Sequence, residues 1–137
     1  MQIILGIDPG YDKMGWCVLH KDRGVQHIVV SGCIETKKTE TIYARYAQLQ
    51  KGLEAIITEY RPTVCALENL FFEKNVKTAM RVSETRGIIM GIFIQHQVSI
   101  IEYTPAQVKS ALTGNGRATK ADITRMMKLL TKRKELP

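Results

Sequence analysis

The chain has 137 residues, 45% of them hydrophobic, a size that suits one domain with a single core and excludes two large lobes. No apolar run is long enough to span a bilayer, and the amino terminus resembles a strand rather than a signal peptide, so we expect a cytoplasmic protein without a membrane partner. The formal net charge of +7 suggests DNA or RNA as a partner, although a solvated basic surface explains it equally well.

The first part of the chain predicts three strands. An apolar run at residues 2–7 ends at Asp8, before a Pro-Gly turn signal, and therefore indicates a buried strand. Residues 15–19 and 26–34 indicate the next two strands, with a hairpin turn at residues 21–24 between them. Short connections between consecutive strands predict an antiparallel meander.

Helices and strands alternate in the rest of the chain. Apolar residues between positions 42 and 60 recur on one helical face, and Pro62 ends that helix. Residues 64–67 indicate a buried strand that ends at Glu68, residues 77–95 a long helix, and residues 98–103 a further strand. Two helix starts then follow, each marked by a threonine cap and a capping-box side chain, in the segments 104–107 and 119–122.

This order of elements predicts an α/β fold, with three antiparallel and then two parallel strands in one mixed sheet flanked by helices. A right-handed crossover places the fourth strand beside the first. Asp8 and Glu68 would then emerge at the same edge of the sheet, where open α/β sheets place their ligands.

Asp8 and Glu68 together suit Mg²⁺, with Mn²⁺ as a substitute, because both ions prefer carboxylate oxygens. In phosphodiester hydrolysis such ions activate the attacking water and stabilise the leaving oxygen. Asp8 alone is more typical of a turn residue. Glu68 is harder to explain structurally, because an acid after a buried strand needs water, a partner or a metal. The pair favours a metal site.

Six residues are candidates for nucleic-acid contact: Phe71, Phe72, Lys74, Lys109, Arg117 and Lys120. The two phenylalanines could stack on unpaired bases or pack under the long helix, and we expect one exposed and one in the core. The last three cations flank a Gly-Asn-Gly loop at helix starts, which suits phosphate oxygens, although a solvated helix face is the alternative.

The cysteines and histidines predict no metal site. Cys17, Cys33 and Cys65 lack a C-x-x-C spacing and lie in apolar runs, so we expect three buried, reduced thiols. The three histidines have no partner at ligand spacing and are expected to be ordinary surface or core residues.

Three blocks of sequence, in order along the whole chain, resemble the RuvC family of Holliday junction resolvases. The matching segments are residues 4–10, 31–34, 68–75, 84–87, 103–109, 114–116 and Lys120. The resemblance implies an RNase H-like fold in a homodimer that makes paired nicks in four-way junction DNA during recombination and repair. It implies the branch-migration complex RuvAB as a partner.

The resemblance also implies roles for single residues. It makes Asp8 and Glu68 the metal ligands and catalytic residues, and the two phenylalanines junction-loop residues at the crossover. It places Lys109 and Lys120 near the scissile phosphate or the DNA backbone. The apolar helical face at 87–94 would suit the dimer interface.

The sequence departs from the family in one respect. The family has two further ligands, an acid or histidine and then an aspartate, on a final helix, but this sequence ends at Pro137, where that helix should begin. We therefore expect residues 1–137 to form a single nuclease domain without its final helix. If they are the entire molecule, we expect weak Mg²⁺ binding and little or no cleavage.

Three other functions stay open. A catalytically incomplete four-way-junction-binding protein would share the fold and the basic surface, but Mg²⁺ would produce no nicks. An actin-like ATPase fragment would explain residues 6–10 as a phosphate loop, but that class needs a second lobe. A resolvase-like RNA nuclease would prefer structured RNA to junction DNA.

Overall fold

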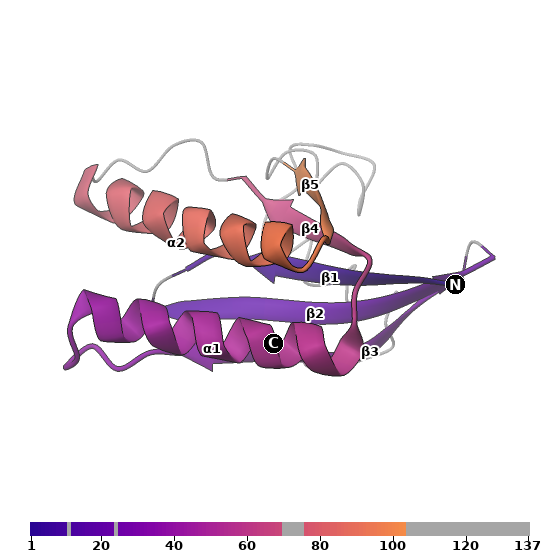
Figure 1. Cartoon of the computed structure of the whole chain (residues 1–137), viewed down its shortest axis with the longest axis horizontal. Coiled ribbons are helices and arrows are strands. Elements are labelled where there is room, and N and C mark those ends of the chain that lie inside the picture. The colour runs from indigo at the N-terminus through magenta and orange to yellow at the C-terminus, as the bar shows by residue number, and fades with distance from the viewer. Residues whose placement is uncertain (11, 24, 70–75, 104–137) are drawn as a thin grey trace, which may run out of the picture.

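The computed structural model describes residues 1–10, 12–23, 25–69 and 76–103 (Figure 1). Its elements, in chain order, are β1 (Gln2–Asp8), β2 (Lys13–Asp22), β3 (Val25–Glu35), α1 (Ile42–Tyr60), β4 (Val64–Glu68), α2 (Val76–Gln95) and β5 (Ser99–Tyr103). The predicted helix starts at 104 and 119 lie outside the described residues. Neither described helix is long and apolar enough to cross a membrane.

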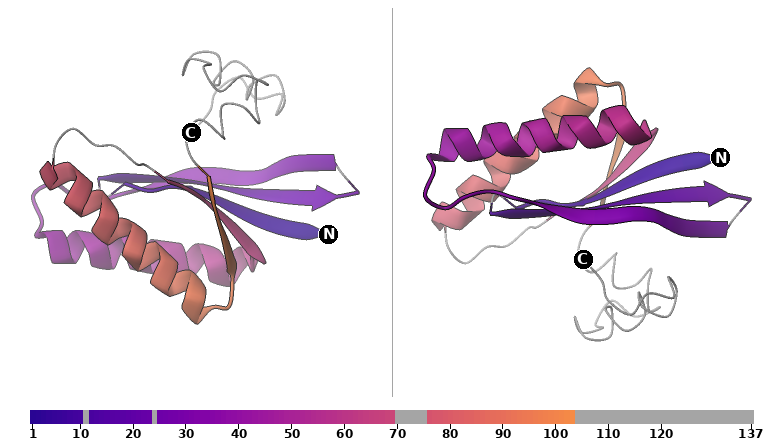
Figure 2. Two further views of the ribbon diagram at one scale, coloured as in Figure 1. Left: turned by 90° about the horizontal axis from the view of Figure 1, so that it is seen from above. Right: turned by 90° about the horizontal axis from the view of Figure 1, so that it is seen from below.

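The five strands form one mixed sheet in the order β3-β2-β1-β4-β5. The first three strands pair antiparallel, and β1–β4 and β4–β5 pair parallel, as the order of elements predicted. Figure 2 shows that α1 and α2 both lie on one side of the sheet. Among the described residues, the opposite side of the sheet therefore has no helix over it.

The core lies between the sheet and the two helices. Because side chains of a strand alternate between faces, Leu5 and Ile7 of β1 point into this core, and the even-numbered residues of β1 lie on the other face. The helices contribute the core residues Leu49, Leu53, Ile56 and Ile57 from α1, and Ile89, Ile92 and Phe93 from α2. The helical period predicted at 42–60 is thus confirmed as a buried face.

Helix α1 ends before Pro62, as its sequence predicts, and a threonine caps its start. Thr41 caps its start, because its Oγ1 accepts a hydrogen bond from the backbone N–H of Ala44 at 3.2 Å. At the other end Arg61 adopts a left-handed conformation with φ of 49°, and its N–H donates to the carbonyl of Ile57 at 2.8 Å. Pro62 follows, and it cannot continue the helical hydrogen bonding.

The strands β2 and β3 are longer than predicted. The sequence indicated strands at 15–19 and 26–34, but the ladder runs from the pair Lys13–Glu35 to the pair Asp22–Val25. Most of the residues that the ladder adds are polar, and apolar alternation does not detect polar residues that pair through their backbone. Strands β1 and β4 likewise each extend by one residue, to include Asp8 and Glu68.

Candidate functional site

Strands β1 and β4 bring Asp8 and Glu68 to the same edge of the sheet. The two strands are parallel neighbours in which Ile7 pairs with Leu67, and the two acids are the next residue of each strand. Both acids lie on the face that α1 and α2 leave uncovered, because Ile7 and Leu67 point into the core. The predicted neighbouring strands are confirmed, and the role of the two carboxylates stays a prediction.

A hollow of about 470 Å³ lies over these strand ends, and Asp8 and Glu68 both line it. We call it the carboxylate hollow. Its other lining residues include the small residues Gly6, Gly15 and Ala66, which come from β1, β2 and β4. Small side chains next to the two acids leave room for a ligand above the sheet, and the exposed Asp8 keeps the hollow open to solvent.

The donor set of the hollow fits a hydrated divalent cation. Among the described residues, Asp8 and Glu68 are the acids that line it, and Lys13 is the cation. The Lys13 Nζ lies 3.9 Å from Glu35 Oε1 in a largely exposed pair. Mg²⁺ is commonly held by one or two carboxylates and completes its octahedron with water or phosphate oxygens. No cluster of three or more metal-ligating side chains occurs in the described part of the chain.

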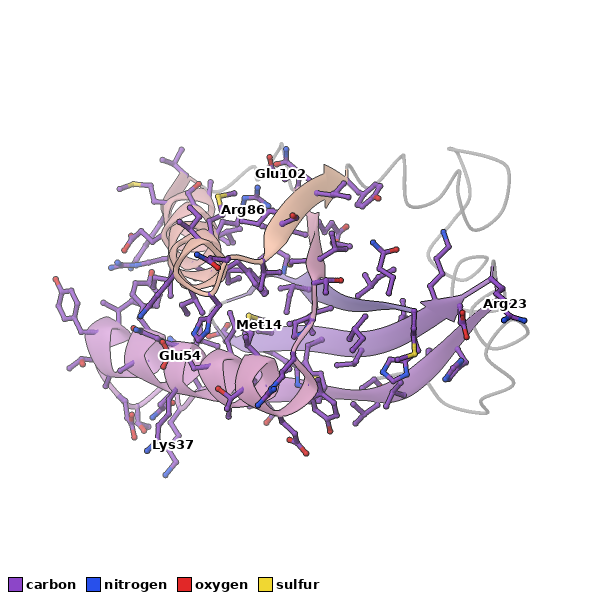
Figure 3. All side chains as sticks on the ribbon, turned by 45° about the vertical axis from the view of Figure 1, so that its right-hand side comes forward. Met14, Arg23, Lys37, Glu54, Arg86 and Glu102 are labelled. Atoms are coloured by element: carbon purple, nitrogen blue, oxygen red, sulfur yellow. The ribbon has the colours of Figure 1, made fainter. Side chains whose placement is uncertain are left out.

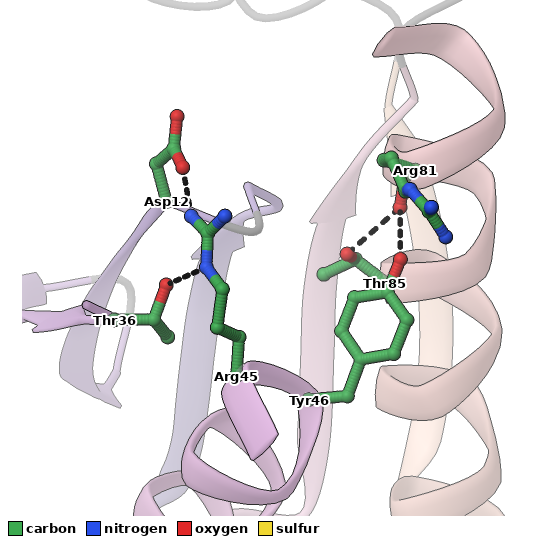
Figure 4. A network of polar contacts seen from close by, with 6 residues as sticks. All are labelled: Asp12, Thr36, Arg45, Tyr46, Arg81 and Thr85. Carbon is green, nitrogen blue, oxygen red and sulfur yellow. Dashed lines mark hydrogen bonds and ion pairs between the residues drawn. The ribbon is translucent and has the colours of Figure 1, made fainter. Parts of the chain in front are cut away.

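A buried arginine holds the loop that leaves Asp8 (Figure 4). Arg45 of α1 is 8% exposed, its Nε donates to Thr36 Oγ1 at 2.9 Å, and its guanidinium forms an ion pair with Asp12. The backbone N–H of Thr36 also donates to the carbonyl of Asp12 at 3.0 Å. These contacts tie the β1–β2 connection to α1 and the end of β3. Sequence reasoning missed this network, although Arg45 falls on the apolar face of α1, four residues before Leu49.

Gly10 has no room for a side chain in this connection. A Cβ at Gly10 would lie 2.4 Å from the backbone carbonyl oxygen of Lys13, so alanine must displace the loop. We expect Gly10→Ala to lower the free energy of unfolding by about 1–3 kcal/mol, in the range of other overpacked sites. Urea unfolding followed by fluorescence of Trp16, the single tryptophan, measures this change.

Gly6→Ala is the matched control. A Cβ at Gly6 would have its nearest neighbour at 3.8 Å, which is an ordinary contact. We expect it to change the free energy of unfolding by no more than about 0.5 kcal/mol. Equal stability of the two variants would contradict the proposed crowding at Gly10.

The cysteines differ from the prediction of three buried thiols. Only Cys65 of the three is buried, and burial raises the pKa of its thiol to about 12, which keeps it protonated. Cys17 and Cys33 are half-buried and line the carboxylate hollow, because they lie on the uncovered face of β2 and β3. Strand alternation, counted from Asp8 through the register of the sheet, would have placed them there.

Two histidines that the sequence left unconnected are neighbours in the sheet. His20 of β2 pairs with His27 of β3, and the centroids of their rings lie 5.5 Å apart. Sequence spacing could not find this pair, because it depends on the register of the hairpin, which an irregularity between Val18 and Leu19 shifts.

The candidate DNA-contacting residues Phe71, Phe72, Lys74, Lys109, Arg117 and Lys120 lie outside the described residues. The chain enters both of the segments that contain these candidates directly after residues at the carboxylate hollow. Glu68 precedes the segment 70–75, Tyr103 precedes the segment 104–137, and these two residues pair between β4 and β5. Tyr103 itself lines the hollow and is 39% exposed.

Comparison with known proteins gave consistent matches over nearly the whole chain. The family model described as "Crossover junction endodeoxyribonuclease RuvC" matches residues 4–137. Proteins with the same description from Pseudothermotoga lettingae and Petrotoga mobilis are 39% and 42% identical over 135 residues, which is 98% of this chain and 83% of each relative.

Solved structures gave matches of the same kind. A structure of Thermus thermophilus RuvC in complex with a Holliday junction substrate is similar with a TM-score of 0.91 and 26% identity, covering 100% of this chain and 84% of that one. The yeast mitochondrial Holliday junction resolvase has a TM-score of 0.68 and 14% identity over 92% of this chain and 60% of that one, which supports the fold alone.

Proposed function

Because the chain belongs to the RuvC family of crossover junction endodeoxyribonucleases, we propose that it resolves Holliday junctions by metal-dependent hydrolysis of DNA phosphodiesters at Asp8 and Glu68. The observation that carries this proposal is the placement of both carboxylates in one hollow at the ends of paired parallel strands. The substrate is four-way junction DNA, the ligand in the structure of the Thermus thermophilus relative.

The two carboxylates would hold Mg²⁺, or Mn²⁺ in its place, against the scissile phosphate. The ion supplies charge stabilisation at the phosphoryl oxygens and lowers the pKa of a bound water. Asp8 and Glu68 would fix the position of the ion, since each ends a strand whose backbone is fixed by its neighbours in the sheet. Gly6, Gly15 and Ala66 leave space for the phosphate beside the carboxylates.

We further propose that the segments flanking the hollow contact the DNA. Phe71, Phe72 and Lys74 follow Glu68 within six residues, and Lys109 follows Tyr103 by six. A junction held over the hollow would therefore lie near the described residues from which both segments continue. Arg117 and Lys120 extend the same basic region, and the net charge of +7 favours binding to a polyanion. The family resemblance supports RuvAB as a partner at the junction.

A homodimer would supply two active sites for paired nicks. Helix α2 has an outer face formed by Val76, Met80, Gly87, Gly91 and Ile94, which its 3.6-residue period places on one side. The three apolar side chains are 73%, 61% and 70% exposed, and a Cβ at either glycine would meet nothing within 4 Å. An exposed apolar face of this kind is typical of a protein interface, and we propose a second copy of this chain as its occupant.

This outer face includes part of the stretch at 87–94, whose apolar helical face the sequence expects to suit an interface. Within that stretch Ile89, Ile92 and Phe93 belong to the core of the described structure. Gly87, Gly91 and Ile94 are the exposed residues of that stretch, Ile88 and Met90 are half-buried, and Val76 and Met80 extend the face toward the start of α2.

The dimer face can be tested by a charge at its centre. We expect Gly91→Glu to raise the dissociation constant of the homodimer at least about tenfold, because the interface would bury an unpaired carboxylate. Sedimentation velocity over a range of protein concentrations measures this constant. Ala47→Glu, at an exposed position of α1, is the matched control and should leave it unchanged. If the dissociation constants of both variants are equal, the interface lies on another surface.

The nuclease activity is tested on a synthetic four-way junction with and without Mg²⁺. Two proteins are compared: residues 1–137, and the extended protein, in which residues 1–137 are followed by the segment that continues the Thermus thermophilus RuvC chain past its match to Pro137. We expect the extended protein to nick junction DNA only with the ion present. Tight junction binding without nicks in both proteins would support the catalytically incomplete binding protein instead. Faster cleavage of structured RNA would support an RNA nuclease.

A further inference from the structure

Arg86 of α2 connects three elements at the end of β4, on the helix-covered face of the sheet that is opposite the carboxylate hollow. Its Nη1 donates to the backbone carbonyl oxygen of Glu68 at 2.5 Å, and its Nη2 forms an ion pair with Glu102 of β5 (Figure 3). The Arg86 side chain is only 11% exposed, whereas Glu102 is 43% exposed. A single guanidinium therefore joins the helix to the last residue of β4 and to the neighbouring strand.

This contact lies where β4 ends. Beyond Glu68, the backbone N–H of Asn69 donates to the carbonyl of Tyr103 at 2.6 Å, and the next described residue is Val76. The carbonyl of Glu68 has Arg86 as a hydrogen-bond donor, which comes from a different layer of the fold. Arg86 and the Tyr103 carbonyl thus restrain the same peptide from two directions.

The chemistry of this position requires arginine. The planar guanidinium presents several N–H donors in a fixed geometry, so it can bind a carbonyl and a carboxylate at once. The ammonium of lysine is a point charge on a flexible stem, and it could keep the attraction to Glu102 without the directed hydrogen bond to Glu68.

We propose that Arg86 is a positioning residue of the metal site, which sets the place of the Glu68 carboxylate by fixing the backbone of the residue that carries it. This inference rests on the proposed role of Glu68 as a metal ligand. Groups that orient a metal ligand reduce the reorganisation needed when the ion binds, and their loss commonly weakens metal affinity about 10–100-fold. A side chain that only attaches α2 to the sheet would change stability and leave metal affinity unchanged.

The test is a titration of the extended protein with Mn²⁺ alone, without DNA, in which the electron paramagnetic resonance signal reports free Mn²⁺. We expect Arg86→Lys to weaken Mn²⁺ binding about tenfold. Junction binding without metal should change less than about twofold, and a higher Mn²⁺ concentration should restore nicking. Arg81→Lys is the matched control, because Arg81 is on the same helix and its ion pair with Glu84 lies within α2. Wild-type Mn²⁺ affinity in folded Arg86→Lys overturns the inference.

A second variant keeps the test decisive if Arg86→Lys does not fold. Glu102→Gln leaves Arg86 in place and removes the charge that orients it, so we expect Mn²⁺ binding to weaken by about two- to fivefold, less than the loss of Arg86 itself. Unchanged affinity in this variant would overturn the inference. Asp8→Asn in the same titration separates this failure from that of the proposed function. If Asp8→Asn leaves Mn²⁺ binding unchanged, the ion does not bind at the two carboxylates, whatever Arg86 does.

Discussion

Replacement of Asp8 by asparagine in the extended protein is expected to lower the rate of junction nicking at least about a hundredfold and to leave junction binding unchanged. Asparagine keeps the size of the side chain but removes one of the two negative charges in the carboxylate hollow. A bound metal ion contributes several kcal/mol to stabilisation of the transition state, and each 1.36 kcal/mol changes the rate tenfold. Single-turnover nicking of a labelled junction in saturating protein measures the chemical step separately from binding.

The same substitution separates the two interpretations of the Asp8-Pro9-Gly10 turn. Asparagine serves in turns as well as aspartate does, so a residue that only closes the turn would tolerate Asp8→Asn. Glu35→Gln is the control, because it removes one carboxylate from a largely exposed ion pair with Lys13 at the same end of the sheet. Equal nicking rates of Asp8→Asn and Glu35→Gln would remove Asp8 from the metal site.

A protein limited to residues 1–137 is expected to nick junction DNA at least about a hundredfold more slowly than the extended protein. Asp8 and Glu68 together balance the charge of one divalent cation, whereas four carboxylates balance two. The family resemblance implies that a final helix adds two more ligands beside this pair. Nicking rates of the two proteins at equal Mg²⁺ concentration give the comparison directly.

The predicted difference in nicking rate requires that the extension acts through its two metal ligands. A version of the extended protein with its two expected ligand residues changed to alanine should fold and dimerise like the extended protein, yet nick as slowly as residues 1–137. If that version retains full activity, the added segment acts by some means other than metal binding. If the extended protein itself does not nick, the explanation of the slow form fails.

The sheet could be predicted because its signals are local. The apolar residues before Asp8 and Glu68 define two buried strands, and the handedness of crossovers makes those strands neighbours, so the meeting of both acids at one edge followed from the sequence. Helix α1 could be placed from its apolar period and Pro62 for the same reason. Such signals extend over a few residues, and single-sequence patterns detect them.

Polar contacts between distant segments could not be predicted. Arg45 pairs with Asp12 across 33 positions, and Arg86 pairs with Glu102 across 16. Both arginines lie on helices whose apolar period fixes the core face but does not select a partner for a charged residue at its border. Those partners depend on the distance and angle between a helix and the sheet, which only the folded chain defines.

Helix α2 has one further consequence for the proposed homodimer. Gly87 and Gly91 lie on the side of α2 that faces away from the core. Arg86 is next to Gly87 in the sequence, and its side chain points toward the sheet and contacts Glu68. Each active site of the dimer would thus be connected to the twofold axis through less than one turn of helix α2, which is a rigid element. The protein would then fix the separation of the two nicks in the DNA. A change in the crossing angle of the two α2 helices would shift both nick positions together and leave the rate of each nick largely unchanged.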